Sequence, residues 1–294
     1  MKSSALLCFR INVFSCSSES GNPASVILSD RALSAVVKQR LAKKLGTAET
    51  AFVTRMQSGF VLEFFTPVVP VRSCGHASLA AACAVDMAYP SAGKTICFLL
   101  HGEPLIVEKK QRSQTHFSLF DRAWHIKKAS SAPVSLLAAL NIQGNQYPFF
   151  HLTNDNGRSR CAILLPDEAT LFRLHPGNVR LSAFLSEQHT GCFAFTYCVS
   201  RRESMVGRFF APHIGIDEDI YNGNSAIAAV SLANYICAKS GFSGPDYLNV
   251  SQGKHHAQLS HARVSMAGHD MISSVALEAE LHVCEHFYLD EDAN

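Results

Sequence analysis

The sequence offers little that would take this chain to a membrane or to nucleic acid. No hydrophobic run approaches the ~18 residues of a membrane-spanning helix, and the net charge of +2 is not gathered into a basic stripe. The apolar run at residues 5–9 is broken by Arg10, which leaves it too short for a secretory signal. We therefore expect a cytoplasmic protein with no nucleic-acid partner and no membrane partner.

Cysteines are present, but they lack the spacing of a disulfide framework or a zinc site. Ten cysteines are scattered along the chain without a C-x-x-C pair, and several stand inside apolar, strand-like runs. This pattern is typical of buried free thiols in a reducing compartment. We expect no disulfide and no bound metal.

The composition is that of an α/β enzyme-sized chain. Hydrophobic residues make up 47% of its 294 residues and charged residues 17%, which is enough apolar material for two cores. Apolar runs and their periodicity predict strands at 6–14, 24–28, 51–56, 60–66, 95–100, 104–109, 115–120, 148–153, 160–165, 192–199, 207–211, 248–252, 258–265 and 274–284. They predict helices at 30–45, 76–88, 132–140, 168–174, 179–187 and 224–239.

Two segments about half a chain length apart resemble each other. Cys74–Ala82 and Asn222–Val230 each place a glycine and small polar residues directly before an alanine-rich stretch. The helices that follow are apolar nearly all round, which is typical of helices buried on every side. We therefore expect two similar halves, each a barrel-like sheet wrapped round a central helix. The predicted domains are residues 1–126, to which a strand at about 281–294 can return, and residues 132–280.

These two helix starts are also candidate binding elements. The free N–H groups and the dipole of a helix N-terminus both attract an anion. If both starts face one interdomain cleft, they can hold a carboxylate between them.

Three side chains near these helix starts are candidates for chemistry. Glu49 stands at the mouth of an apolar strand, where partial burial would raise its pKa toward the range of a general acid/base; the alternative is a capping or surface glutamate. His76 follows Gly75 at a helix start, which favours a neutral imidazole, although it could simply bond to nearby backbone. Asp219 could orient a partner or bind an amino group, or be an ordinary loop carboxylate.

The chain resembles the PhzF-like (phenazine biosynthesis-like) family, relatives of diaminopimelate epimerase and proline racemase, nearly from end to end. In the first half the motifs are Gly21-Asn22-Pro23-Ala24-Ser25-Val26, Glu49-Thr50-Ala51-Phe52-Val53, Phe65-Thr66-Pro67 and Cys74-Gly75-His76-Ala77-Ser78. In the second half they are Arg208-Phe209-Phe210-Ala211-Pro212, Glu218-Asp219, Gly223 with Ala226, and Gln252-Gly253.

The resemblance implies a diaminopimelate epimerase-like fold with the site between the halves. It places Glu49 at the family's acid/base glutamate, His76 and Gly75 at the Gly-His pair that lines the site, and Asp219 at a signature aspartate. The signature itself is altered, because Ile220, Asn222, Asn224 and Ser225 replace Pro, Thr, Ser and Ala. These replacements lead us to expect a specialised activity on a substrate other than that of the family's namesake.

The resemblance and the residues together predict a cofactor-independent isomerase that acts on a small carboxylate-bearing metabolite. Glu49 would transfer the proton, while His76 and Asp219 bind or orient the substrate. The predicted substrate-binding residues are Gly75, Ala77, Asn222, Gly223, Asn224 and Ser225. Related racemases use two cysteines; here Cys74 fits the first position, but the second falls near Asn222, which cannot carry a proton.

Other functions are also compatible with these motifs. An epimerase, a racemase or a dehydratase on the same fold, or a non-enzymatic binding member, would share these motifs. A homodimer is expected from the family resemblance and from the frequency of dimers among oligomers.

Overall fold

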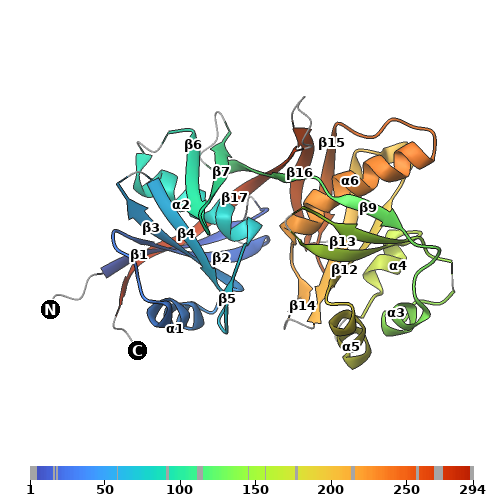
Figure 1. Ribbon diagram of the computed structural model, residues 1–294, viewed down its shortest axis with the longest axis horizontal. Helices are drawn as coiled ribbons and strands as arrows, with labels where there is room; N and C mark the ends of the chain where they lie inside the picture. The colour runs from blue at the N-terminus through green and yellow to red at the C-terminus, as the bar shows by residue number, and fades with distance from the viewer. Residues whose placement is uncertain are drawn as a thin grey trace. The chain divides into compact units, whose positions relative to one another are not determined.

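The computed structural model describes residues 5–15, 17, 19–57, 59–90, 93–110, 115–144, 146–155, 157–175, 178–212, 216–255, 258–267 and 274–291. The chain forms two compact units (Figure 1). Unit 1 comprises Met1–Phe120 and Glu278–Asn294, and unit 2 comprises Asp121–Leu277. The sequence pattern predicts the boundary at 127–131, whereas the structural division falls after Phe120.

Unit 1 is a strand barrel with one helix inside it and one outside. Its elements are β1 (Ala5–Val13), β2 (Asn22–Ser29), α1 (Ala35–Leu45), β3 (Glu49–Met56), β4 (Gly59–Phe65), β5 (Pro70–Val71), α2 (Gly75–Ala88), β6 (Thr95–Leu100), β7 (Glu103–Lys109), β8 (His116–Arg122) and most of β17 (Ser274–Asp290). The pairings run β1–β2–β3–β4–β6–β7–β8–β17 and return to β1, so the barrel is closed. Closure leaves no free edge among its main strands.

Helix α2 lies inside this barrel and packs against β1, β2, β3 and β7 (Figure 1). Every residue from His76 to Val85 is buried, as the sequence predicts for a helix without a polar face. The small side chains of its alanine run allow the strands to approach closely. Helix α1 instead packs outside against β3 and β4.

Helix α1 begins later than the sequence pattern predicts. The pattern predicts a start at residue 30, but the Ser34 side chain accepts a hydrogen bond from the Val37 N–H and caps the helix. Gly46 ends it in the left-handed region, at φ 66°. Both are standard signals for the two ends of a helix, and they fix α1 to Ala35–Leu45.

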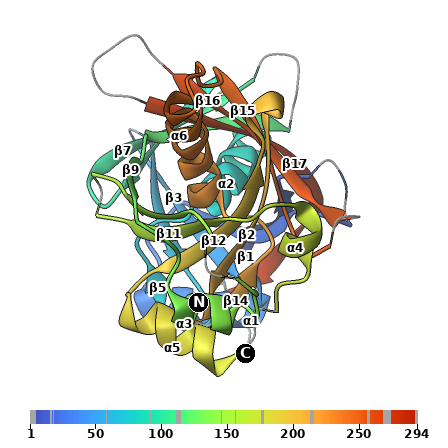
Figure 2. The same ribbon diagram turned by 90° about the vertical axis from the view of Figure 1, so that its right-hand side faces the viewer.

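Unit 2 repeats this plan. Its elements are β9 (His125–Lys128), α3 (Val134–Ala139), β10 (Phe149–Thr153), β11 (Ser159–Leu164), α4 (Glu168–Phe172), α5 (Val179–Glu187), β12 (Gly191–Tyr197), the 3-10 turn η2 (Val199–Arg201), β13 (Ser204–Ala211), β14 (Ile216–Asp219), α6 (Gly223–Lys239), β15 (Tyr247–Gln252) and β16 (Ser260–Ala267). Helix α6 packs against β9, β15 and β16 and is buried along most of its length (Figure 2). A separate core joins α3, α4 and α5 to β10–β13.

The strand order confirms the two similar halves. In unit 1 the successive pairings are antiparallel β1–β2, parallel β2–β3, antiparallel β3–β4, parallel β4–β6 and antiparallel β6–β7. Unit 2 shows the same sequence of orientations in β10–β11, β11–β12, β12–β13, β13–β15 and β15–β16. In each unit the central helix follows the fourth strand of the series and precedes the fifth: α2 lies between β4 and β6 in the chain, and α6 between β13 and β15.

Three short strands, β5, β9 and β14, were not evident from the sequence pattern, because each has four residues or fewer. In contrast, β17 extends beyond the predicted residue 284 to Asp290, since it pairs with β1 along its length, from Val13↔Leu281 to Ala5↔Asp290. No helix among the described residues is long and apolar enough to cross a membrane. The described cysteines are all free, and Cys16 lies outside the described residues.

Candidate active site

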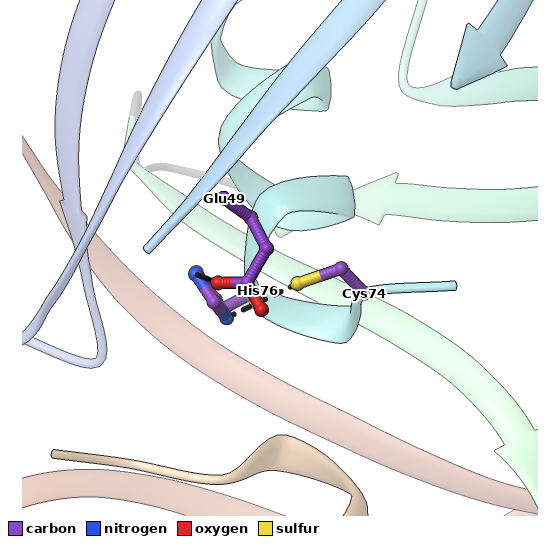
Figure 3. A group of neighbouring side chains, drawn as sticks. All are labelled: Glu49, Cys74 and His76. Carbon is purple, nitrogen blue, oxygen red and sulfur yellow. Dashed lines mark hydrogen bonds and ion pairs between the residues drawn. The ribbon is translucent and has the colours of Figure 1, made fainter. Parts of the chain in front are cut away.

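In unit 1, the start of β3 meets the first turn of α2 (Figure 3). Glu49 is the first residue of β3, and the hydroxyl of Thr47 donates a hydrogen bond to its backbone carbonyl at 3.0 Å. His76 is the second residue of α2. Its Nε2 lies 3.3 Å from Glu49 Oε2, and its Nδ1 lies 3.3 Å from Cys74 Sγ. Thiol, imidazole and carboxylate thus form one continuous chain of contacts.

This group is withdrawn from solvent. His76 is 5% exposed and Cys74 is 8% exposed, while the Glu49 side chain is 15% exposed. Burial raises the pKa of Glu49 from 4.5 to about 7, because a charged carboxylate loses its hydration there. The carboxyl can therefore both accept and donate a proton near neutral pH.

The two nitrogens of the imidazole face different neighbours. Nε2 lies 3.3 Å from Glu49 Oε2, a close polar contact, and Nδ1 lies 3.3 Å from Cys74 Sγ. A neutral imidazole with its proton on Nε2 has an acceptor at Nδ1, which the thiol of Cys74 can face as donor.

The same three side chains are the metal-ligand candidates of this site. Their ligand atoms lie within 4.8 Å of one another. However, His76 directs Nε2 toward Glu49 and Nδ1 toward Cys74, and one metal ion can take only one of these nitrogens. The arrangement therefore fits a chain of polar contacts better than a metal-binding site.

The N-terminus of α2 supplies backbone donors beside this group. Cys74 occupies the N-cap position but makes no side-chain capping hydrogen bond. Gly75 and Ala77, predicted as binding residues, belong to the first turn, whose N–H groups have no intrahelical acceptor. This helix end can therefore attract a negatively charged group.

In unit 2, the predicted residues gather at the start of α6. Asn222 is its N-cap, and its side-chain oxygen accepts from both the N–H and the hydroxyl of Ser225, each at 2.9 Å. The Asn222 amide donates to Asp219 at 3.0 Å. Gly223 is the first helical residue and is buried. Asn222 is thus a structural cap, and its amide cannot act as a second acid/base.

Asn224, which replaces a hydroxyl of the family signature, accepts a hydrogen bond from Arg158 at 2.6 Å. Arg158 also pairs with Asp121 at 2.8 Å. Through Arg158 the larger amide therefore links the first turn of α6 to the segment just before β11 and to the end of β8. A serine at this position would be too short to make the same bond without movement of Arg158.

Two residues that support this loop, Gln252 and Arg208, belong to the sequence motifs, but the sequence alone assigns them no role. Gln252 is fully buried. Its side-chain oxygen accepts from the backbone N–H of Asn222, and its side-chain amide donates to the backbone carbonyl of Asn222, both at 3.1 Å. Arg208 forms a two-pronged ion pair with Glu218 at 2.8 and 2.9 Å. These contacts hold the segment that leads into α6.

The structure therefore brings Glu49, His76, Gly75 and Ala77 together in unit 1. It brings Asp219, Asn222, Gly223, Asn224 and Ser225 together in unit 2. Cys74, which fits the first cysteine position of the related racemases, contacts His76 directly.

Known proteins share both sequence and fold with this chain. The family model described as phenazine biosynthesis-like protein matches residues 11–280. An uncharacterized isomerase of Pseudomonas aeruginosa is 29% identical over 80% of this chain and 83% of its own length. The trans-2,3-dihydro-3-hydroxyanthranilate isomerase of Pseudomonas chlororaphis is 29% identical over 76% of this chain and 79% of its own. A phenazine biosynthesis protein of the PhzF family from Bacillus anthracis has a similar fold, with a TM-score of 0.80, 17% identity and coverage of 97% and 99%.

Proposed function

We propose a single-base proton-transfer mechanism for this chain, which belongs to the phenazine biosynthesis-like protein family and is an isomerase. Glu49 removes a proton from a carbon atom of a small carboxylate-bearing substrate and returns it to another atom on the same face. The observation that supports this most directly is the buried Glu49 carboxyl, which lies 3.3 Å from His76 Nε2 and whose pKa burial raises to about 7. General acid/base transfer requires a group whose pKa lies near the working pH.

His76 acts on Glu49 as a positioning residue in this proposal. Its Nε2 lies 3.3 Å from one carboxyl oxygen and restricts the position of the Glu49 side chain. Cys74 contacts Nδ1 of the same ring and so helps to fix the orientation of the imidazole. Neither residue needs to change its protonation state during a single-base transfer, and the residues of the chain can perform it without a cofactor.

The remaining predicted residues serve binding. The first turn of α2, with Gly75 and Ala77, offers N–H groups that a carboxylate can accept. Asp219 and the first turn of α6 supply a second polar group, with both donors and acceptors. The alteration of the family signature at Asn224 supports a substrate that differs from the one named for the Pseudomonas chlororaphis relative.

A two-thiol epimerase is less well supported, because Asn222 is engaged as a helix cap and carries no transferable proton. We also propose a homodimer and a cytoplasmic location; the pattern of unpaired cysteines supports the latter.

The test is proton exchange with solvent. Purified protein in D₂O is incubated with trans-2,3-dihydro-3-hydroxyanthranilate and with other small carboxylates that bear an acidic C–H, and deuterium incorporation is followed by mass spectrometry. Glu49→Gln should lower exchange by about 100- to 10,000-fold. Glu103→Gln is the matched control, because Glu103 is an exposed glutamate of the same unit. Full exchange by Glu49→Gln would show that another residue is the base.

A further inference from the structure

Arg160 in unit 2 faces away from the core that β11 shares with α3 and α5. Its strand neighbours Cys161 and Ile163 belong to that core, together with Leu136 and Leu181. Side chains alternate along a strand, so Arg160 points to the opposite face. A cation on this face requires a specific explanation.

Two aromatic rings hold the guanidinium. Its Cζ lies 4.3 Å from the ring centroid of Phe209 and 5.8 Å from that of Trp124. Gly191, paired with Arg160 on the next strand, makes room for the Phe209 ring: a Cβ there would stand 2.3 Å from Phe209 Cζ. The platform beneath Arg160 therefore depends on a glycine.

This guanidinium has hydrogen-bonding capacity that the described residues do not use. Arg160 Nε is shielded from solvent and has no hydrogen-bond partner among them, and Arg160 forms no ion pair with them. Within the same part of the chain, the indole N–H of Trp124 is also buried without a partner. Unsatisfied buried donors cost free energy, and the guanidinium lies 5.8 Å from the centroid of the Trp124 ring, so this position is suited to an acceptor ligand.

The surrounding charges define what that ligand can be. Arg158 is already bonded to Asp121 and Asn224, so its charge is compensated. Burial lowers the pKa of Arg160 to about 10, which keeps it cationic at neutral pH, and the nearby charge of Asp219 favours this cation. The net charge of this group, which consists of Arg158, Arg160, Asp121 and Asp219, is close to zero. A monoanion fits such a group, whereas a dianion would be repelled by the two carboxylates.

We propose that Arg160 binds the carboxylate of a small unsaturated or aromatic ligand. The planar fork of the guanidinium matches a carboxylate, and the Trp124 and Phe209 rings provide an apolar wall beside it. The inference rests on the proposed function only in taking a small carboxylate as the ligand. Binding is measured without turnover, so a failure here can be told from a failure of the Glu49 mechanism.

Trp124 provides the readout, because it is the only tryptophan of the chain. The full-length protein is titrated with benzoate, with uncharged benzamide and with inorganic phosphate, and tryptophan fluorescence and calorimetric heat are recorded. Benzoate should bind saturably and change the fluorescence, and the other two should bind at least tenfold more weakly. Arg160→Gln should weaken benzoate binding about tenfold or more, and Arg160→Lys should weaken it less, since an ammonium keeps the charge but loses the fork.

Arg180→Gln is the control, since Arg180 is an exposed arginine of α5 in the same unit. It should bind benzoate as the unmodified protein does. The proposal is overturned if no saturable benzoate binding occurs, if benzamide or phosphate binds as well as benzoate, or if Arg160→Gln binds unchanged. Should Arg160→Gln not fold, unchanged binding by Arg160→Lys would overturn the bidentate contact.

Discussion

His76 Nε2 lies 3.3 Å from Glu49 Oε2, and both side chains are largely withdrawn from solvent. The two residues come from different elements, the first turn of α2 and the first residue of β3. This contact gives Glu49 a fixed orientation, while burial brings its pKa close to 7. The pH dependence of both stability and activity should therefore reflect the titration of Glu49.

The first prediction concerns the pH dependence of stability. The folded-state pKa of Glu49 is raised, so the folded protein holds its proton more tightly than the unfolded chain does. The free energy of unfolding should therefore fall as pH rises from about 4.5 to about 7 and level off above it. Glu49→Gln removes the effect and should stabilise the protein at pH 8 by on the order of 2 kcal/mol, with little change at pH 4.5.

Urea unfolding of Glu49→Gln and of the Glu103→Gln control at both pH values measures this difference. A Glu49→Gln protein that is no more stable than the unmodified chain at pH 8 would contradict the raised pKa. With an identified substrate, the acidic limb of kcat/KM should also bend near pH 7 rather than near 4.5, because the ionised carboxylate is the base.

The second prediction concerns the buried ion pair of unit 2. Arg208 and Glu218 are 5% and 3% exposed, and Arg208 also donates to the carbonyls of Leu171 and Leu174. Glu218→Gln leaves this cation without its charged partner and should lower the free energy of unfolding by about 3 kcal/mol. Chemical denaturation measures the loss. In contrast, Glu203→Gln, at an exposed glutamate, should cost less than about 1 kcal/mol.

The third prediction separates the aromatic platform of Arg160 from general packing. Gly191→Ala and Gly207→Ala each place a Cβ 2.3 Å from a phenylalanine ring, that of Phe209 and that of Phe193 respectively. Both should destabilise the protein by about 1–3 kcal/mol. Only Gly191→Ala should also weaken benzoate binding, because Phe209 carries the guanidinium. Equal benzoate affinities in the two variants would show that the position of the Phe209 ring does not affect benzoate binding.

The fourth prediction concerns metals. Glu49, Cys74 and His76 form a chain of polar contacts in which the two imidazole nitrogens face different side chains. We expect substoichiometric metal in protein purified without chelator, and no change in melting temperature or in deuterium exchange after treatment with EDTA. One equivalent of tightly bound zinc, measured by mass spectrometry and lost in Cys74→Ser, would replace this interpretation with a metal centre.

The fifth prediction concerns assembly. A homodimer should give about twice the 32.0 kDa mass of the single chain in light scattering at micromolar concentration. A mass near that of the single chain would reject the dimer.

Local sequence determined the elements of this protein. The alanine-rich runs after Gly75 and Gly223 have no polar face, so burial of α2 and α6 follows from their side chains alone. The repeated order of strands and helices also predicted two similar halves, since each strand carries its own apolar pattern. The start of α1 was less evident because the Ser34 cap competes with an apparently helical stretch before it.

Tertiary structure decided which side chains meet. Glu49 and His76 are brought together by the packing of α2 against β3. Arg160 of β11 meets Phe209 of β13 and Trp124 of the segment between β8 and β9 only in the folded chain. The return of β17 to β1 likewise joins the two ends of the chain, from Ala5 to Asp290. Periodicity specifies which face of an element is buried, but contacts between distant residues depend on register and packing. The family motifs identified Glu49 as a candidate base, whereas its burial and its contact with His76 exist only in the folded chain.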